Sequence, residues 1–288
     1  MILITGASGH VGGRVAARLA AGGSSLRLLA RDAAKAPVLP GAQIVSADYN
    51  DPVGLDKAFR AVTRAFVVSG SDREGVRAGL HRNVFQAAKR AGVEHLVYLS
   101  FQGASPSSKF SASRDHYQSE QFLKQTGLPF TVLRDNFYLD LIPELFGADG
   151  VIRGPAATGR VAWVARDDVA EVAAAVLSDP SRFSSVYDLT GPEALTMSEP
   201  SRRLAALTGR ILTFHDETIA EGRAWRSALG VADWMVDGWL GSYEAIGAGE
   251  LAAASGAVNE ILGRPPCGLD AYFTRRPELL AAIAKTAR

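Results

Sequence analysis

The sequence is poor in cysteine and in long hydrophobic runs. Cys267 is the only cysteine among 288 residues, which excludes an internal disulfide and a cysteine metal cluster. No apolar run approaches the roughly 18 residues of a membrane span, and the opening MILIT is too short for the apolar region of a signal peptide. We therefore expect a soluble, cytoplasmic protein with no membrane partner.

Charge of one sign is also scarce. Lys and Arg number 31 against 30 Asp and Glu, and the basic residues are scattered rather than gathered in a stripe. This pattern excludes the electrostatic footprint of a nucleic-acid-binding protein, so we expect no nucleic-acid partner. His81, His95 and His215 are far apart and lack metal-ligand spacing, so we expect no metal.

Short apolar runs alternate with helical patterns through the first two-thirds of the chain. The runs read as buried strands. They are Ile2–Thr5, Leu26–Ala30, Gln43–Ala47, Ala65–Ser69, His95–Ser100 and Phe130–Leu133. Such alternation predicts an α/β fold with a doubly wound parallel sheet. We expect a nucleotide-binding domain over 1–190, with segments reaching a smaller lobe over 191–288 that lies on the carboxyl edge of the sheet.

The stretch GASGHVGG follows the first predicted strand and opens a helix, which is where a dinucleotide fold places its phosphate-binding turn. Gly6 permits the sharp turn, Gly9 lets the backbone approach pyrophosphate, and Gly12 lets the helix meet the strand. The free N–H groups of the helix N-terminus would hold the phosphates. A tight turn without a ligand is the less favoured alternative.

The end of the second predicted strand indicates which nucleotide is bound. Arg31 ends this strand and Lys35 follows, and their cationic groups suit the 2′-phosphate of NADP. Asp32 lies between them and could instead bind a ribose, as acidic residues do in proteins that prefer NAD. We therefore expect NADP(H) as the preferred cofactor, with NAD(H) as the alternative.

Six segments in order resemble a known family: GASGHVG, ARDAAKA, SADYNDP, AAKRAGVEHLVYLS, TGLPFTVLR and ARDDVAEVAAAVL. They are similar to the atypical short-chain dehydrogenases, in the NmrA-like branch that includes bacterial NAD(P)H:quinone reductases and triphenylmethane-dye reductases. The resemblance covers about the first 190 residues. The remainder matches only loosely, and substrate choice is expected there.

The resemblance implies a set of cofactor contacts. It places Gly6, Ser8, Gly9, His10 and Val11 around the pyrophosphate, Arg31 and Lys35 at the 2′-phosphate, Asp48 and Tyr49 beside the adenine, Ser69 and Gly70 at the adenine-side ribose, and Ser100 and Phe101 near the nicotinamide. These positions follow strand ends, where such a fold binds its ligand.

The Tyr-x-x-x-Lys pair of most short-chain dehydrogenases is absent. Tyr117-x-x-x-Gln121 has similar spacing, but the family's register places its lysine on His116 and its tyrosine on Ala112. His116 is therefore the candidate catalytic residue, either contacting ribose or nicotinamide or acting as a weak acid. The alternative is a helix histidine without a role, and Tyr117 is interpreted as a packing residue.

The lost tyrosine favours an acceptor that needs no strong acid. Quinones, azo compounds and cationic dyes spread or lose charge on taking a hydride, so positioning against the nicotinamide suffices. Candidate acceptor-binding residues are Gln102, Asn136, Phe137 and Tyr138, with Phe101 as a further aromatic wall. These aromatics could instead only fill the hinge between the lobes.

Two functions remain open at this point. The first is an NADPH-dependent reductase of a small-molecule quinone-like or azo-like acceptor. The second is a regulator that binds NADP without turnover, as the member that names the branch does. An isomerase or lyase is less favoured because those chemistries generally need the tyrosine. A homodimer is compatible with the sequence.

Overall fold

The computed structural model describes residues 1–179 and 186–286. Within these ranges, a seven-stranded sheet has the order β3-β2-β1-β4-β5-β6-β9. Every neighbouring pair in it is parallel. The strands are β1 (Ile2–Thr5), β2 (Leu26–Ala30), β3 (Gln43–Ser46), β4 (Arg64–Val67), β5 (His95–Phe101), β6 (Phe130–Asp135) and β9 (Val186–Asp188). The predicted doubly wound sheet is confirmed.

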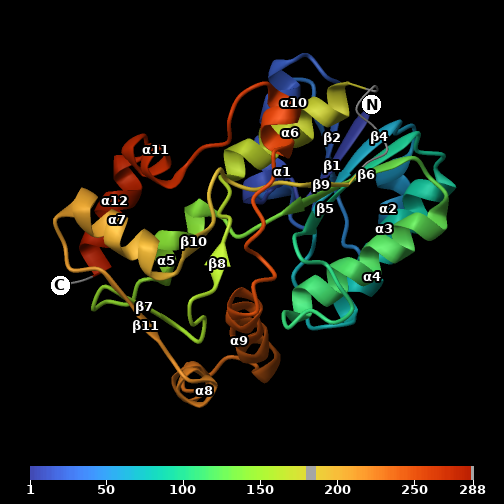
Figure 1. Cartoon of the computed structure of the whole chain (residues 1–288). Helices are drawn as coiled ribbons and strands as arrows, with labels where there is room; N and C mark the ends of the chain where they lie inside the picture. The colour runs from blue at the N-terminus through green and yellow to red at the C-terminus, as the bar shows by residue number, and fades with distance from the viewer. Residues whose placement is uncertain (180–185, 287–288) are drawn as a thin grey trace.

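Helices cover both faces of this sheet (Figure 1). One face packs against α1 (His10–Ala21) and α6 (Arg166–Ser178), and α10 (Ala257–Leu262) lies against α6. The other face packs against α2 (Pro52–Phe59), α3 (Val76–Arg90) and α4 (Ser111–Thr126). A short 3-10 turn, η1 (Ala33–Lys35), follows β2. Both faces of the central strands are therefore buried, as near-continuous apolar strands require, whereas the edge strand β3 is mostly exposed.

A smaller lobe lies beside the sheet, to the left in Figure 1. Its short strands are β7 (Val151–Gly154), β8 (Arg160–Val161), β10 (Leu195–Thr196) and β11 (Thr213–Asp216). Its helices are η2 (Leu139–Leu141), α5 (Ile142–Leu145), α7 (Ser198–Thr208), α8 (Ile219–Ser227), α9 (Asp233–Gly247), α11 (Leu269–Thr274) and α12 (Pro277–Thr286). A hydrophobic core of its own joins these elements apart from α8, which lies against α9 and β7.

The two parts interleave along the chain. α5, β7 and β8 belong to the smaller lobe although they precede residue 190, whereas α10 returns from the C-terminal third to pack on α6. The sequence analysis predicted one boundary at 190, with earlier segments reaching the smaller lobe, and these domain bounds stay a prediction.

Apolar residues every four positions predict a helix from Asp72 to Ala91 with Asp72 as its N-cap, but the third helix begins later. α3 starts at Val76, and the residue before it, Gly75, has φ of 81°. The Asp72 carboxylate accepts a hydrogen bond from the N–H of Arg73 and does not cap the helix. The Gly75 N–H donates to Asp115 Oδ1 at 2.8 Å, which ties this loop to α4. That contact between distant segments moves the start of the helix.

Candidate functional site

The glycine turn brings the start of α1 directly against the end of β1. Gly6 has φ of +59°, a conformation that glycine adopts without strain. A Cβ atom on Gly12 would lie 2.3 Å from the Gly6 carbonyl oxygen, and one on Gly9 would lie 3.2 Å from the same atom. The close approach expected of Gly12 is therefore present, and Gly9 is also held near Gly6 by a hydrogen bond from its N–H at 2.9 Å.

The N-terminus of α1 is open to a ligand. Within the described residues no side chain caps this helix, and Ser8, Gly9 and His10 are exposed. The Val11 side chain is buried in the core, so only its backbone can face pyrophosphate. Uncapped N–H groups at a helix N-terminus are suited to bind phosphate.

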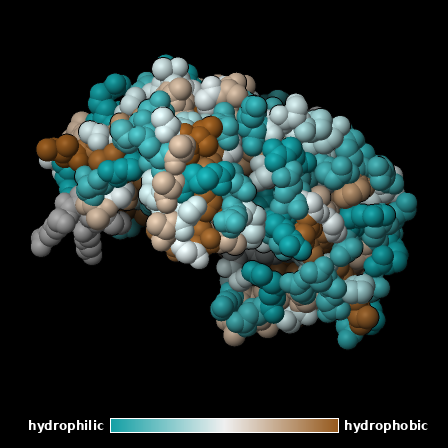
Figure 2. Space-filling model, turned by 90° about the horizontal axis from the view of Figure 1, so that it is seen from below, coloured by the Kyte–Doolittle hydropathy of each residue, from teal (hydrophilic) through white to brown (hydrophobic). Residues whose placement is uncertain are grey.

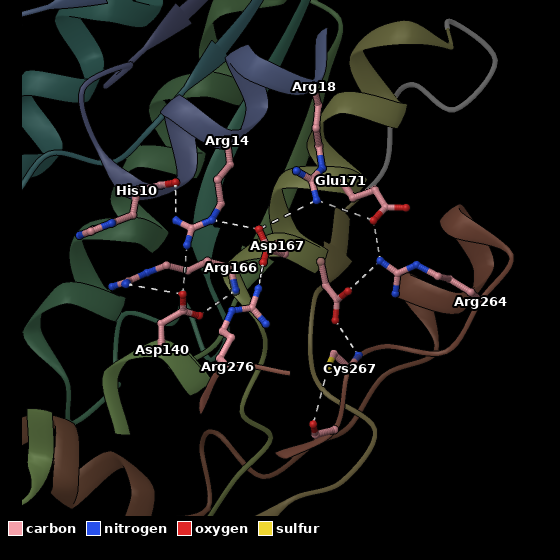
Figure 3. Close-up of polar contacts among 12 residues, drawn as sticks. His10, Arg14, Arg18, Asp140, Arg166, Asp167, Glu171, Arg264, Cys267 and Arg276 are labelled. Carbon is pink, nitrogen blue, oxygen red and sulfur yellow. Dashed lines mark hydrogen bonds and ion pairs between the residues drawn. The ribbon is translucent and has the colours of Figure 1, made fainter. Parts of the chain in front are cut away.

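The turn from Gly6 to Gly12 and the start of α1 form the predicted phosphate site, called the cradle below. A charged network holds α1, the cradle helix, in place (Figure 3). Arg14 on α1 donates to the His10 carbonyl at 2.9 Å and to Asp167 on α6 at 3.0 Å. Asp167 is also bonded to Arg276, which precedes α12. The cradle helix is thereby connected to α6 and to the smaller lobe through one carboxylate.

Two exposed cations follow β2, where the sequence predicts a 2′-phosphate site. Arg31 and Lys35 are exposed. Asp32 turns back into its own turn, where Oδ1 accepts the Ala34 N–H at 3.0 Å and Oδ2 lies 3.8 Å from Lys35 Nζ. Its carboxylate is therefore already engaged locally, which weakens the alternative that it binds a ribose.

The hydroxyl of Tyr49 fastens three strand ends together. The Val68 N–H donates to Thr5 Oγ1 at 2.9 Å, Thr5 Oγ1 lies 2.6 Å from Tyr49 Oη, and Tyr49 Oη donates to the Val68 carbonyl at 2.7 Å. Burial raises the pKa of Tyr49 above its ordinary value. Only the ring of Tyr49 is left to face an adenine. Asp48 accepts the Asn50 N–H at 2.9 Å in the same loop.

A buried polar chain links the predicted ribose loop to His116. Gly70, next to Ser69, donates its N–H to His81 Nε2 at 3.0 Å. His81 Nδ1 lies 2.8 Å from Ser119 Oγ and 3.1 Å from Tyr98 Oη. Tyr98 Oη lies 2.9 Å from His116 Nδ1.

The hydrogen bonds in this row of polar side chains fix the protonation of His81 and His116. Ser119 Oγ donates to the Asp115 carbonyl, so it accepts from His81 Nδ1. His81 accepts at its other nitrogen and is therefore neutral, and burial lowers its pKa to about 3. Tyr98 can then donate to His116 Nδ1, which places the proton of neutral His116 on Nε2. Within the described part of the chain, Nε2 makes no hydrogen bond.

The His116 side chain is unsuited to act as an acid in this structure. Burial, followed by the charges of His81, Arg77 and Arg134, lowers its pKa well below the ordinary value. Of the two roles expected from the sequence, a neutral Nε2–H donor to ribose or nicotinamide fits these surroundings, whereas an imidazolium acid does not.

Ser100, the last residue but one of β5, turns its hydroxyl toward α4. Ser100 Oγ donates to Glu120 Oε1 at 2.7 Å, and Arg134 binds both oxygens of the same carboxylate at 2.8 and 2.6 Å. The Glu120 side chain is only 1% exposed. These contacts connect β5 and β6 to α4, the helix that carries His116.

Two predicted acceptor-binding amides instead fasten the two parts of the molecule. Asn136 Nδ2 donates to Gln102 Oε1 at 2.5 Å and to the Leu251 carbonyl at 3.0 Å, and Gln102 Nε2 donates to the Ala253 carbonyl at 2.7 Å. Both side chains are buried. The structure gives these amides a structural contact rather than a free polar group.

Phe137 and Tyr138 point in opposite directions, as successive extended residues do. Phe137 packs on the core of the smaller lobe, whereas Tyr138 packs on the core beneath α1 and α6. Tyr138 donates its hydroxyl to Asp135, and Arg166 lies 4.8 Å from its ring centroid. Tyr138 is therefore on the cradle side of β6.

An apolar cavity of about 950 Å³ opens beside Phe137. Its wall is formed mainly by α5, β7, β11, α8 and α9. It includes Phe137, Leu141, Glu144, Leu145, Phe146, Gly147, Val151, Arg153, Trp163, Met197, His215, Glu217, Glu221, Trp225, Arg226, Leu229, Trp239, Ser242, Tyr243 and Ile246. Of the four predicted acceptor residues, only Phe137 is among them, so Gln102, Asn136 and Tyr138 do not line this cavity.

Aromatic rings connect the cavity to His116. The Phe101 ring is stacked on His116 with centroids 6.2 Å apart, and Phe137 lies 5.2 Å from Phe101 and 6.0 Å from Trp163. The rings of Phe101, Phe137 and His116 therefore lie next to one another.

The sequence missed most of the cavity wall. Three of the four tryptophans line it, namely Trp163, Trp225 and Trp239. The spacing of the tryptophans in the sequence did not predict where they lie, because their elements are short and come from distant parts of the chain.

Seen from below, hydrophobic side chains gather in patches toward the left and middle of the molecule, between hydrophilic ones (Figure 2).

Two features are absent from the residues that the structure describes, namely a membrane-spanning helix and a cluster of metal ligands. Among the residues it describes, no helix is both long and apolar enough to cross a membrane. No group of three or more His, Cys, Asp or Glu side chains in the same ranges could hold a metal ion.

Comparison with known proteins gives consistent relatives. Quinone oxidoreductase 2 of Escherichia coli is 31% identical over 272 residues, covering 92% of this chain and 94% of the relative. An NAD(P)H azoreductase of Xenophilus azovorans is 29% identical over 272 residues, with the same shares covered. A (4-alkanoyl-5-oxo-2,5-dihydrofuran-3-yl)methyl phosphate reductase of Streptomyces griseus is 34% identical over 274 residues, again with these shares.

A solved structure agrees with the same assignment. An NADPH-dependent quinone oxidoreductase from Escherichia coli, complexed with NADPH, superposes with a TM-score of 0.87 at 30% identity. The superposition covers 96% of this chain and 99% of the other. A family model described as NAD(P)H-binding matches residues 6–180, more than half of the sequence. The resemblance stated from the sequence is confirmed, and the chain belongs to this NAD(P)H-binding family.

Proposed function

We propose that this protein is an NADPH-dependent reductase that transfers hydride to a quinone-like, azo-like or other electron-poor conjugated acceptor. The observation that supports the proposal is the aromatic cavity, which is connected through Phe137 and Phe101 to His116 and so to the predicted nicotinamide position. A protein that only senses nucleotide has no need of such a cavity beside the predicted nicotinamide position. The names of the relatives, a quinone oxidoreductase, an azoreductase and a reductase of a conjugated lactone, support the same chemistry.

The residues around the cradle fit an NADPH molecule. The uncapped start of α1 would hold the pyrophosphate through the backbone of Gly9, His10 and Val11. Arg31 and Lys35 are exposed cations at the place of the 2′-phosphate. When bound, NADPH supplies the hydride.

His116 would position the cofactor rather than deliver a proton. Its Nδ1 is held by Tyr98, so a proton on Nε2 can be donated to a ribose hydroxyl or to the carboxamide. Tyr98 and His81 act through His116 and through Gly70, and we assign them as positioning residues. These hydrogen-bonded side chains would thereby orient Gly70 at the adenine-side ribose and His116 at the nicotinamide-side ribose.

An acceptor without a strongly basic product suits this arrangement. Ala112 stands where the family places its proton-donating tyrosine, and Tyr117 makes no hydrogen bond with the described residues. A quinone or azo compound delocalises the charge that it gains, so its product can take a proton from water. The protein then contributes mainly by holding two flat rings at reacting distance.

The rival function is a regulator that binds NADP without turnover. It shares the cradle but makes no use of the cavity. The two functions also differ in what the acceptor does to bound cofactor. A reductase oxidises NADPH only when an acceptor is present, whereas a sensor leaves NADPH unchanged with every acceptor.

The test is NADPH oxidation across a panel of quinones, azo dyes and conjugated enones, run beside an unconjugated ketone. We expect turnover with at least one conjugated acceptor, little with the ketone, and a lower KM for NADPH than for NADH. NADPH binding measured by calorimetry, together with no turnover on any acceptor, would favour the regulator instead.

A further inference from the structure

The cavity is far larger than the ring that would react. A cavity of about 150 Å³ is enough to hold benzene, whereas this one measures about 950 Å³. Phe137 and Trp163 are its wall toward the nucleotide site, and the rest of the wall belongs to the smaller lobe. If the proposed function holds, an acceptor has most of this volume for groups other than its reacting ring.

The far wall is aromatic and is held by one arginine. The Arg226 guanidinium carbon lies 4.2 Å from the Trp225 ring centroid and 5.4 Å from that of Tyr243. Tyr243 in turn covers Gly154, where a Cβ atom would lie 2.3 Å from the ring. The rings are thereby packed in fixed positions, which favours a flat aromatic occupant.

Both arginines of the wall are already neutralised by carboxylates. Arg226 pairs with Glu217 at 2.9 Å, each side chain being 3% exposed, and its other N–H groups donate to the carbonyls of Gly222 and Arg153. Arg153 binds both carboxylate oxygens of Asp149. Neither guanidinium offers an unpaired charge to a ligand.

Two carboxylates of the wall have no such counter-ion. Glu144 on α5 is exposed and makes no ion pair within the described ranges. Glu221 on α8 accepts the Thr218 N–H and Oγ1–H, both at 2.8 Å, and these hydrogen bonds hold its pKa below the ordinary value. His215 on β11 is the titratable group that faces Glu221.

We propose that this cavity selects acceptors whose reacting ring carries a bulky aromatic group that is uncharged or cationic, and that Glu144 and Glu221 reject anionic groups. The inference rests on the proposed function and deepens it. The selection comes from two sources: aromatic walls that reward flat apolar area, and an unbalanced negative charge at the cavity that penalises a second negative charge.

The experiment uses three acceptors with one naphthoquinone ring, each joined by a saturated linker to a phenyl group. The phenyl group carries trimethylammonium, tert-butyl or sulfonate. The linker isolates the quinone from the charge, so the three share one reduction potential, and tert-butyl matches trimethylammonium in shape. We expect kcat/KM to fall in the order ammonium, tert-butyl, sulfonate, with about tenfold or more between the first and last at low salt. Added salt should shrink that ratio.

Glu144→Gln and Glu221→Gln should each lower the ammonium-to-sulfonate ratio by about threefold. Glutamine still completes the capping box at Glu221, so the helix start is retained. Glu94→Gln removes an exposed carboxylate far from the cavity and serves as the charge-matched control, which should leave the ratio unchanged.

A second readout keeps this inference separate from the proposed function. Quenching of tryptophan fluorescence by the same three compounds reports binding, because Trp225 and Trp239 line the cavity. If no acceptor is reduced, the proposed function fails, and the order of binding still tests the charge selection. Equal use or equal binding of the sulfonate compound, or a ratio that Glu144→Gln and Glu221→Gln leave unchanged, would overturn the inference.

Discussion

The predicted nucleotide cradle and the cavity beside Phe137, which we propose binds the acceptor, are built in different ways. The cradle consists of backbone: a turn at Gly6, an uncapped helix start, and glycines that let α1 touch β1. The cavity consists of side chains that short elements bring together from between residues 137 and 246. Backbone geometry demands particular residues at particular spacing, whereas a side-chain wall tolerates many solutions. The first is therefore readable from sequence, and the second is not.

The largest expected effect tests the backbone side of this comparison. Gly12→Ala would place a Cβ atom 2.3 Å from the Gly6 carbonyl and 2.9 Å from that of Thr5, so helix and strand must separate. We expect a loss of about 3 kcal/mol or more in the free energy of unfolding, measured by urea titration.

Gly13→Ala is the matched control on the same helix. Its Cβ atom would lie 3.1 Å from the Ala7 carbonyl, and the gain in helix propensity offsets part of the strain. We expect a change within about 1 kcal/mol. Equal losses at both positions would show that the close approach at Gly12 is not special.

The next effect concerns the cofactor. Arg31→Ala should raise the KM for NADPH by about ten- to a hundredfold while leaving that for NADH nearly unchanged, because only NADPH has the 2′-phosphate. Arg60→Ala, which removes another exposed guanidinium of the same domain, should change neither value. Parallel losses for both cofactors at Arg31 would contradict the 2′-phosphate assignment.

The sequence predicted most of the nucleotide domain because local and periodic signals coincide there. Ile2–Thr5 and Leu26–Ala30 are strands with the expected bounds. Where a distant contact decides, as Asp115 does at the start of α3, the local pattern was misleading.

The predicted site residues divide along the same line. Gly6, Gly9 and Gly12 form the turn between β1 and α1, and their contacts with a nucleotide stay a prediction. Side-chain roles depend on partners far along the chain: Asn136 and Gln102 bind carbonyls at 251 and 253, so these amides are buried. No spacing rule relates residue 136 to residue 251, and only folding reveals that contact.

A smaller effect comes from a buried carboxyl on the cradle side of β6. Burial raises the pKa of Asp135 to about 8, although the Tyr138 hydroxyl and the Arg166 charge act in the opposite direction. In the unfolded chain the pKa of this carboxyl has its ordinary value of 3.8. The folded state therefore binds the extra proton between these values, and stability is lost as pH rises toward 8.

Asp135→Asn should remove that dependence, because the amide oxygen still accepts from Tyr138 and carries no charge. We expect the variant to gain at least about 1 kcal/mol relative to the parent at pH 8.5, with a smaller difference at pH 5. Thermal unfolding at the two pH values measures it. A parent protein whose stability is flat from pH 5 to 8.5 would show that Asp135 is ionised throughout.

The smallest expected effect is that of Tyr117→Phe, which separates spacing from position. The Tyr117 hydroxyl makes no hydrogen bond within the described structure, and Tyr117 lies one position beyond His116, on which the resemblance places the family's lysine. We expect quinone reduction to slow by less than about tenfold, below the 10²–10⁴-fold range of a true general acid. His116→Ala should cost more, chiefly in KM for NADPH, since it removes the Nε2–H donor and leaves the Tyr98 hydroxyl without its acceptor. A thousandfold loss of turnover in Tyr117→Phe with cofactor binding intact would make Tyr117 the proton donor. In that case the side-chain chemistry of this site would follow sequence spacing after all, and ordinary ketones would become substrates.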